Sequence, residues 1–268
     1  MSHVSLTDDG SWRWWHGASD ANLTLLSAAD DPLWLLRLIL GSDIALSSGS
    51  WRPAGWAGET LLYRDEKISI VLTPFDQCNP DARVALVGLM PGRHQLHLAL
   101  TTVAAALRDG QSIDHAITRA KTRAAFAGPT RANLIRMLDG IGLHDALTVP
   151  STESLFGDRT DLVTTTSAIC HAVFVRAGKN YGGTPPVARH PLMAAFARQV
   201  LAANLAMTPN ALIIPLGDAA SDATRLAGAD PGRVLYGFPH PSPGNGHRER
   251  KYAHARSQLN HQILHWTM

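Results

Sequence analysis

The stretch "VALVGLMPGRHQ", Val84 to Gln95, joins an apolar run to a turn that contains glycine and proline. Its first five residues are apolar without strict alternation, which is typical of a parallel strand covered on both faces. In the turn, Gly88 and Gly92 allow close approach of the backbone, and Pro91 fixes the bend. The stretch therefore predicts a buried strand that ends in a tight turn.

Three further segments share this apolar character, and helical patterns separate them. The segments are "DLVTTTSAI" at Asp161–Ile169, "ALIIPLG" at Ala211–Gly217 and "RVLYGF" at Arg233–Phe238. The helical patterns cover Thr130–Gly142, His190–Ala206, Asp218–Gly228 and His247–His265. This order predicts an α/β fold, a three-layer α/β/α sandwich with a central, mostly parallel sheet of about four strands. Ligands of such sheets bind at the carboxyl ends of the strands.

The composition sets the broad class of the protein. The chain has 268 residues, 45% of them hydrophobic, which is enough for a sizeable core. Its two cysteines, Cys78 and Cys170, cannot supply the thiolates of an iron–sulfur cluster or a closed zinc site. No apolar run approaches the roughly 18 residues of a membrane span, and "MSHVSLTDDG" lacks the order of a signal peptide. We therefore expect a cytoplasmic protein with no membrane partner.

The first 80 residues differ from the rest, because they hold six of the seven tryptophans. We predict an N-terminal Trp-rich extension or subdomain over residues 1–80 and an α/β domain over residues 81–268. Two interpretations of these tryptophans are open. They pack the interior of the subdomain, or they form a surface that stacks on bases or binds a partner. Here Asp31–Leu40 predicts a buried helix, and Leu61–Leu72 predicts two strands around a charged turn.

The turn "FPHPSPGNGHR", Phe238 to Arg248, combines rigidity with polar side chains. Prolines on both sides stiffen the backbone around His240. Ser242 and Asn245 can hydrogen-bond a phosphate or cap the last helix. Basic side chains are unfavourable in the first turn of a helix unless an anion lies nearby. The basic side chains placed there are Arg248, Arg250 and Lys251. The arrangement predicts a phosphate partner, although the net charge of the chain is only +2.

The turn "GLMPG" and the later "HPSPGN" together resemble the two signature motifs of the uracil-DNA glycosylase superfamily. Between them, "FAGPTRANLIRMLDGIGL" at Phe126–Leu143 is similar to the pattern PF-x-G-x-x-G-x-x-L-x-x-M-L-x-x-x-G-L of the iron–sulfur branch, and "IIPLGDAASDATRL" to its strand, Leu-Gly turn and helix. The resemblance covers residues 82–265. It implies an enzyme that flips a nucleotide out of DNA and cleaves the N-glycosidic bond without a metal or other cofactor.

The resemblance also implies roles for individual residues. His240 would donate a hydrogen bond to the departing base, on which negative charge develops. The loop that follows would press into the minor groove and hold a phosphate. The implied DNA-binding residues are Pro241, Ser242, Pro243, Asn245, Arg248 and Lys251. Phe126 matches the aromatic residue that stacks on the flipped base. The implied base-binding residues are Gly88, Met90, Pro91, Gly92, Phe126 and Ser167.

Members of the superfamily usually carry a polar residue that activates water in the first motif, and this chain has Leu89 and Met90 there. Neither side chain can orient or deprotonate water. Gln95 is our choice for that catalytic role because it follows the bend at Gly92, and the nearby His94 and Asp76 are the alternatives.

The second departure concerns base recognition. In canonical members of the superfamily that this chain resembles, an asparagine at the end of the second strand reads the base. This chain has Ser167 at the matching position, and its hydroxyl is shorter and can rotate. We therefore expect a larger pocket with relaxed selection of uracil. The segment Phe174–Pro191 could line that space through Lys179, Asn180 and Tyr181, and a solvated loop is an equally open interpretation.

Three functions follow from these observations. The first is a monofunctional DNA glycosylase that acts on uracil or, in preference, on a modified pyrimidine such as hydroxymethylated or glucosylated cytosine in phage DNA, in repair or antiviral defence. The second is a non-catalytic module that binds a flipped, modified base, which the missing water activator favours. The third is a metal hydrolase suggested by "HQLH" at His94–His97, which lacks a recognisable third ligand.

Overall fold

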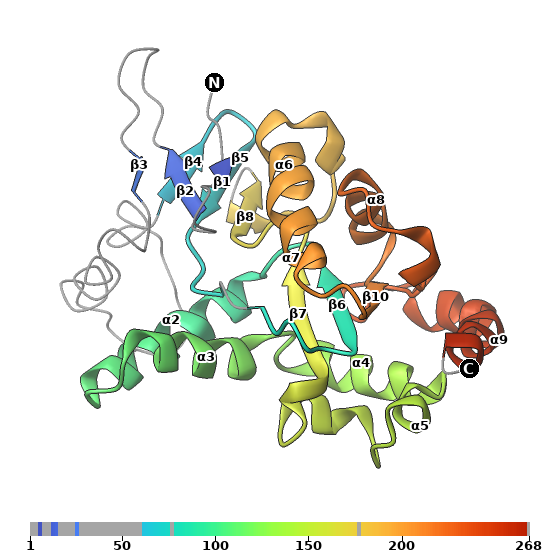
Figure 1. Ribbon diagram of the computed structural model, residues 1–268. Coiled ribbons are helices and arrows are strands. Elements are labelled where there is room, and N and C mark those ends of the chain that lie inside the picture. Colours follow the sequence, from blue (N-terminus) through green and yellow to red (C-terminus); the bar gives the residue numbers. More distant parts are fainter. Residues whose placement is uncertain are drawn as a thin grey trace. The chain divides into compact units, whose positions relative to one another are not determined.

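The structure, a computed structural model of the chain, describes residues 5–6, 12–15, 25–26, 61–75, 78–175 and 178–266 (Figure 1). These residues group into two compact units. The parallel-sheet unit consists of Cys78–Leu89, Ala125–Ala168 and the described residues from Gly183 onwards. The antiparallel-sheet unit consists of Met90–Ala124 and the described residues of Ile169–Gly182 and of the chain before Cys78. The helix predicted at Asp31–Leu40 lies outside the described residues, and the domain boundary at residue 80 stays a prediction.

The parallel-sheet unit is built on three parallel strands in the order β10-β6-β7 (Figure 1). They are β6 (Val84–Gly88), β7 (Val163–Ser167) and β10 (Leu212–Pro215). All five residues of β6 and all four of β10 are buried. This confirms the prediction from their unbroken apolar sequences, because strands covered on both faces need no polar alternation.

Helices cover both faces of this sheet. Side chains of β6 and β10 that point to one face share an apolar cluster with residues of three helices. These helices are α4 (Pro129–Gly140), α5 (Leu143–Leu147) and α9 (Arg248–Trp266). Helix α8 (Asp218–Leu226) contacts β6 and β10, and a continuous helical segment packs on α8. That segment contains α6 (Pro191–Ala195), the π-helix η5 (Phe196–Leu201) and α7 (Ala202–Ala206). The predicted three-layer α/β/α order is confirmed.

The number of strands needs a correction. The segment predicted as a fourth strand makes one isolated parallel bridge, between Val234 and Ile213, so the described sheet has three strands. The short helix η6 (Pro231–Arg233) occupies its beginning. Farther along, Gly237 has a φ of 93°, and Pro239 has no N–H to donate. A regular ladder therefore stops after one bridge, and the chain turns toward His240.

The antiparallel-sheet unit contains a four-stranded sheet in the order β4-β5-β8-β9. Its strands are β4 (Leu61–Arg64), β5 (Ile68–Val71), β8 (Ala172–Val175) and β9 (Lys179–Asn180). The predicted pair around a charged turn is confirmed as β4 and β5, with Asp65 accepting the N–H groups of Lys67 and Ile68. The sequence patterns did not indicate β8 or β9. Three short antiparallel strands also belong to this unit: β1 (Ser5–Leu6), β2 (Trp12–Trp15) and β3 (Leu25–Leu26).

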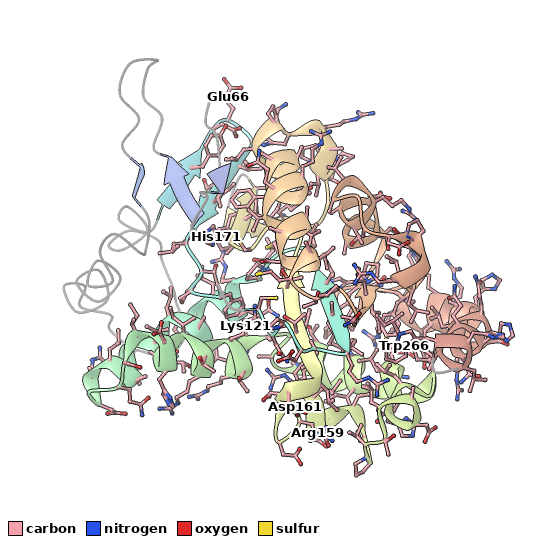
Figure 2. All side chains as sticks on the ribbon, in the orientation of Figure 1. Glu66, Lys121, Arg159, Asp161, His171 and Trp266 are labelled. Atoms are coloured by element: carbon pink, nitrogen blue, oxygen red, sulfur yellow. The ribbon has the colours of Figure 1, made fainter. Side chains whose placement is uncertain are left out.

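Two long helices complete this unit, α2 (Arg93–Arg108) and α3 (Ile113–Ala124). Fully buried alanines, including Ala99 and Ala120, let them pack closely. His171, labelled in Figure 2, is buried beside the sheet, and its Nδ1 accepts the N–H of Thr73 at 3.3 Å. The described helices of the chain include none that combines the length and apolarity needed to cross a bilayer.

Candidate active site

His240 lies in a turn of the parallel-sheet unit, and a hydrogen bond fixes the tautomer of its ring. The backbone N–H of Ser242 donates to Nδ1 of His240 at 3.2 Å, so the proton of the neutral ring is on Nε2. Burial lowers the pKa of His240 below its usual value of 6.5, because the charged ring loses hydration. At neutral pH the side chain is therefore a neutral imidazole with one N–H to donate.

Gly217, two residues after the end of β10, makes room for this histidine. Its φ is 90°, a region that residues with a side chain rarely adopt. A Cβ atom on Gly217 would lie 2.8 Å from Cβ of His240, closer than real Cβ contacts come. The N–H of Gly217 also donates to the carbonyl of Phe238 at 2.8 Å. The Leu-Gly turn thus sets the position of the His240 backbone.

Polar side chains hold the loop after His240. Three of them donate to its backbone carbonyls, each at 3.0 Å. The pairs are Asn245 Nδ2 with His240, Asn133 Nδ2 with Pro241 and Arg248 Nη1 with Ser242. In the same loop, the hydroxyl of Ser242 accepts the N–H of Gly244 at 3.2 Å. Pro241 is buried, whereas Pro243 is exposed. The loop is fixed by hydrogen bonds as well as by its prolines.

Three of the residues expected to bind the base come together at the carboxyl ends of β6 and β7. Gly88 is opposite Ser167 in the parallel register. A Cβ atom on Gly88 would lie 3.3 Å from both Phe126 Cε1 and Ser167 Oγ. The aromatic edge, the hydroxyl and the bare glycine backbone therefore form one small surface at the sheet edge where α/β proteins bind ligands.

Phe126 has an unusual backbone conformation. Its φ is 54°, in the left-handed region, which costs a bulky residue about 1–2 kcal/mol. Gly128, two residues on, has a φ of 77°. Such strain persists only where surrounding contacts determine the conformation, and it is concentrated at functional sites.

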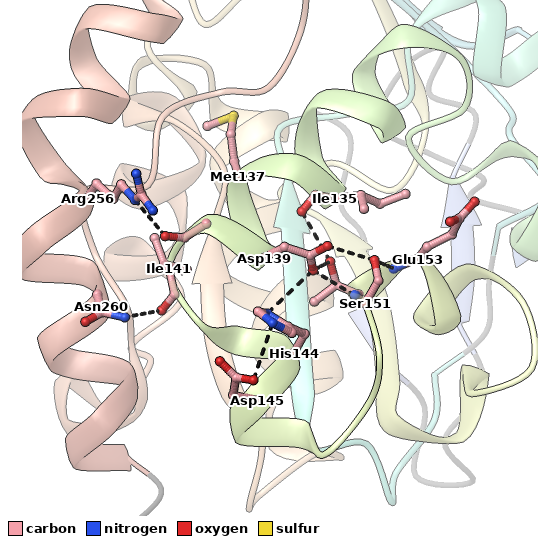
Figure 3. A network of polar contacts seen from close by, with 12 residues as sticks. Ile135, Met137, Asp139, Ile141, His144, Asp145, Ser151, Glu153, Arg256 and Asn260 are labelled. Carbon is pink, nitrogen blue, oxygen red and sulfur yellow. Dashed lines mark hydrogen bonds and ion pairs between the residues drawn. The ribbon is translucent and has the colours of Figure 1, made fainter.

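Helix α4 supports this turn and the His240 loop, and its far end is anchored (Figure 3). The carboxylate of Asp139 accepts hydrogen bonds from Ser151 Oγ (2.7 Å), Thr152 N (2.8 Å) and Thr152 Oγ1 (2.7 Å). Burial alone would raise the pKa of Asp139, but these hydrogen bonds outweigh it and hold that pKa below its usual value. From α9, Asn260 Nδ2 donates to the carbonyl of Ile141 at 2.9 Å.

From Met90 onwards the first motif lies in the antiparallel-sheet unit, where two of its side-chain acceptors are bonded. The Sδ atom of Met90 accepts the N–H of Val173 at 3.5 Å. Pro91 is buried. The Oε1 atom of Gln95 accepts the N–H of Gly92 at 2.9 Å, which caps the start of α2. The structure thus gives Gln95 a structural contact, and its role in holding water stays a prediction.

Two of the three basic residues at the start of α9 have carboxylate partners. Arg248 pairs with Glu249 at 3.0 Å, and Lys251 pairs with Asp218 at 2.8 Å. Internal anions therefore offset part of the unfavourable charge in this helical turn, which the sequence argument assigned to a phosphate. The pair of Lys251 and Asp218 is exposed, and exposed pairs are weak and can exchange for a phosphate, whereas the side chain of Arg248 is largely buried. The DNA contacts of both residues remain predictions.

Comparison with known proteins agrees with this geometry. A family model described as the uracil DNA glycosylase superfamily matches residues 75–264. The chain belongs to the uracil-DNA glycosylase superfamily. It is also 35% identical over 209 residues to the uncharacterized protein YoxB of Bacillus subtilis (strain 168), over 75% of this chain and 81% of that protein. Superfamily members are typically DNA glycosylases and act on DNA, and this suggests the same kind of activity here.

Several residues that the site uses were absent from the sequence predictions. Gly217 had a signal, because the Leu-Gly turn resembles a superfamily feature. Asn133 had none, since its bond to Pro241 joins positions 108 residues apart. Arg131, which stands at the second glycine of the pattern of the iron–sulfur branch, was also missed.

The side chains expected to line a larger base pocket, and those suggested as metal ligands, lie in different environments. Tyr181 is buried, and burial raises its pKa to about 12, whereas Lys179 is exposed. Asn180 Oδ1 accepts the N–H of Arg93 at 3.1 Å, at the start of α2. His94 and His97 are exposed, and among the residues that the structure describes no three potential ligands gather in a group that could hold a metal ion. Asp76 lies outside that part of the chain.

Proposed function

We propose that this protein is a monofunctional DNA glycosylase that flips a base out of DNA and hydrolyses its N-glycosidic bond, leaving an abasic site. The observation that carries the proposal is His240, held as a neutral donor by the Ser242 N–H on Nδ1. As the glycosidic bond breaks, negative charge develops on the departing pyrimidine. The Nε2–H group of His240 would stabilise that charge without prior loss of a proton, because its orientation is already fixed.

We further propose a modified pyrimidine, rather than uracil alone, as the substrate. Ser167 supports this, since a rotatable hydroxyl next to Gly88 can serve as donor or acceptor and does not select one base edge. Hydroxymethylated and glucosylated cytosines of phage DNA are the test cases, which would place the protein in antiviral defence. The thiol state of Cys78 and Cys170 supports a cytoplasmic location.

A second function, a module that binds a flipped base without cutting it, has its own support. The first motif offers a thioether at Met90 in place of a polar group, and the acceptor of Gln95 is bonded to Gly92. A pocket that stabilises a departing base and lacks a water activator would bind without turnover.

Base excision on defined DNA tests these functions. Single strands and duplexes would carry uracil, hypoxanthine, 5-hydroxymethylcytosine or its glucosylated form, and alkali would reveal strand scission at the marked base. We expect at least one modified-pyrimidine substrate to be cut, and His240→Ala to lower the single-turnover rate at least about a hundredfold. His247→Ala, which removes an exposed histidine from the same loop, is the matched control.

The outcomes separate the alternatives. Tight binding of a modified base with no abasic product on any substrate would support the binding module. Equal rates for wild type and His240→Ala would exclude His240 from catalysis. Excision of uracil alone would refute the modified-pyrimidine proposal while leaving the glycosylase intact.

A further inference from the structure

An arginine in the first turn of α4 is bonded to the strained turn that presents Phe126. The guanidinium of Arg131 donates from Nε (3.0 Å) and Nη2 (2.6 Å) to one acceptor, the carbonyl oxygen of Ala125. Its Cζ atom lies 4.8 Å from the ring centre of Phe156, as in a cation–π contact. Burial lowers the pKa of Arg131 below its usual value. Two independent contacts therefore hold a partly dehydrated cation against the turn.

The position of this acceptor matters for the geometry of Phe126. The carbonyl of Ala125 and the N–H of Phe126 belong to the same planar peptide unit. When the carbonyl is fixed in direction, rotation about the N–Cα bond of Phe126 is restricted as well. That rotation is the φ of 54°, which a bulky residue keeps only if its neighbours impose it. Arg131 supplies such a constraint.

The arginine departs from the pattern of the iron–sulfur branch that this segment resembles. In the segment that begins at Phe126, the pattern has glycine where this chain has Arg131. A cation so near the start of a helix is opposed by the helix dipole. Its presence there is explained by what it binds, the Ala125 carbonyl and the Phe156 ring.

We propose that Arg131 is a positioning residue that locks Phe126 in its left-handed turn, so that the ring is already in place beside Gly88 and Ser167 when a flipped base arrives. The proposal rests on the proposed glycosylase function. If the ring is already in position, the incoming base does not have to order it. More of the binding free energy then remains to orient the scissile bond. Arg131 acts through Phe126 and does not itself touch the base.

Single-turnover base excision with three variants tests this role. Arg131→Gly, which introduces the glycine of the iron–sulfur-branch pattern, should lower the rate about 10- to 100-fold, the size expected for a misplaced contact. Arg131→Lys should recover part of the rate, because an ammonium can still donate one hydrogen bond to Ala125. Arg136→Ala removes the same charge from an exposed position of α4 and should stay within about twofold of wild type. Equal losses in Arg131→Gly and Arg136→Ala would overturn the proposal in favour of a simple charge effect.

A double-mutant cycle shows whether the effect passes through Phe126. Phe126→Gly removes the ring and relieves the positive φ. In that background, Arg131→Gly should have no further effect on the excision rate, because there is no ring left to position. If the two substitutions reduce the rate additively, Arg131 does not act through Phe126, and the proposal fails.

A readout independent of catalysis separates the proposal from the proposed function. In protein labelled with 4-fluorophenylalanine, the ¹⁹F signal that disappears in Phe126→Gly identifies Phe126. Arg131→Gly should shift and broaden that signal and leave the signal of the buried Phe196 unchanged. An unchanged Phe126 signal would overturn the positioning role. If wild type cuts no substrate, the glycosylase function fails, whereas the ¹⁹F signal still decides whether Arg131 holds the ring.

Discussion

The turn Gly88–Gln95 begins at the end of β6, and the loop Phe238–His247 follows a segment with a single parallel bridge, yet the polar groups of the two are used differently. Around His240, the backbone of the loop is held by side chains, and the Nε2–H of the imidazole is left to donate. In the first turn, the thioether of Met90 and the amide of Gln95 each bond the backbone of their own unit. For the proposed hydrolysis, the contacts around His240 favour stabilisation of the departing base, whereas the contacts of Met90 and Gln95 leave the activation of water without an evident group.

The largest effect on the excision rate is expected from a substitution that displaces His240. Gly217→Ala places a Cβ atom 2.8 Å from Cβ of His240 and forces alanine into a φ of 90°. We expect the single-turnover rate to fall about a hundredfold, and the free energy of unfolding to fall by about 1–3 kcal/mol. Gly228→Ala is the control, because Gly228 has a φ of 73° and open space around it. A similar loss of rate in both variants would mean that backbone strain, and not His240, is responsible.

The second prediction concerns the antiparallel-sheet unit, which contains Met90 and Gln95. Burial lowers the pKa of His171 to about 3, against 6.5 when unfolded. Between these values the unfolded chain binds more protons, so the stability present above pH 6.5 is lost as the pH falls toward 3, with a slope of up to about 1.4 kcal/mol per pH unit. Chemical denaturation at pH 7.5, 6 and 5 measures the loss.

His171→Asn provides the matched variant for that measurement. An asparagine can still accept the N–H of Thr73 but does not titrate, so the pH dependence should become flatter. His240 contributes with the same sign, because burial also lowers its pKa. If His171→Asn leaves the slope unchanged, the loss of stability comes from other groups.

The third prediction sharpens the role of Gln95. Gln95→Ala should lower the excision rate about tenfold if the side chain holds the water, and should cost about 1 kcal/mol of stability through loss of the cap on Gly92. Gln95→Glu should keep the cap, since a carboxylate also accepts the N–H of Gly92. A loss of stability with an unchanged rate in Gln95→Ala would leave Gln95 with capping alone.

The smallest expected effect concerns Lys251. It must exchange the carboxylate of Asp218 for a DNA phosphate, so its net contribution is small. Lys251→Ala should weaken duplex binding about two- to fivefold and reduce the slope of log K against log salt by about 0.9. Lys67→Ala, at an exposed turn of the other unit, is the control. An unchanged salt slope would remove Lys251 from the DNA contacts.

The sequence predicted those parts of the molecule whose cause is local. The unbroken apolar runs at Val84–Gly88 and Leu212–Pro215 identified buried parallel strands because burial on both faces leaves a direct mark on composition. The strand Ala172–Val175 was missed, since its pairing with Ile68–Val71 depends on residues about a hundred positions away. The predicted fourth strand failed for a local reason, the positive φ of Gly237.

The same division holds for the candidate site. His240 and its prolines could be read from one short motif. The contact of Arg131 with the Phe126 turn could not be predicted in this way. Arg131 has a role only if that turn is left-handed, and the sequence does not give the φ angle. Gln95 is the opposite case. The sequence suggested a catalytic role for its side chain, and in the structure its amide oxygen caps the start of α2.

Helix α4 has a consequence for how this site can change. One helix carries Arg131, which holds the turn of Phe126, and Asn133, which holds the loop of His240. Its other end is fastened through Asp139. A substitution that shifts α4 would disturb the Phe126 turn and the His240 loop together. If the protein is a glycosylase as proposed, we therefore expect few such changes to preserve activity, and we expect changes of base preference chiefly at Ser167, at the end of β7.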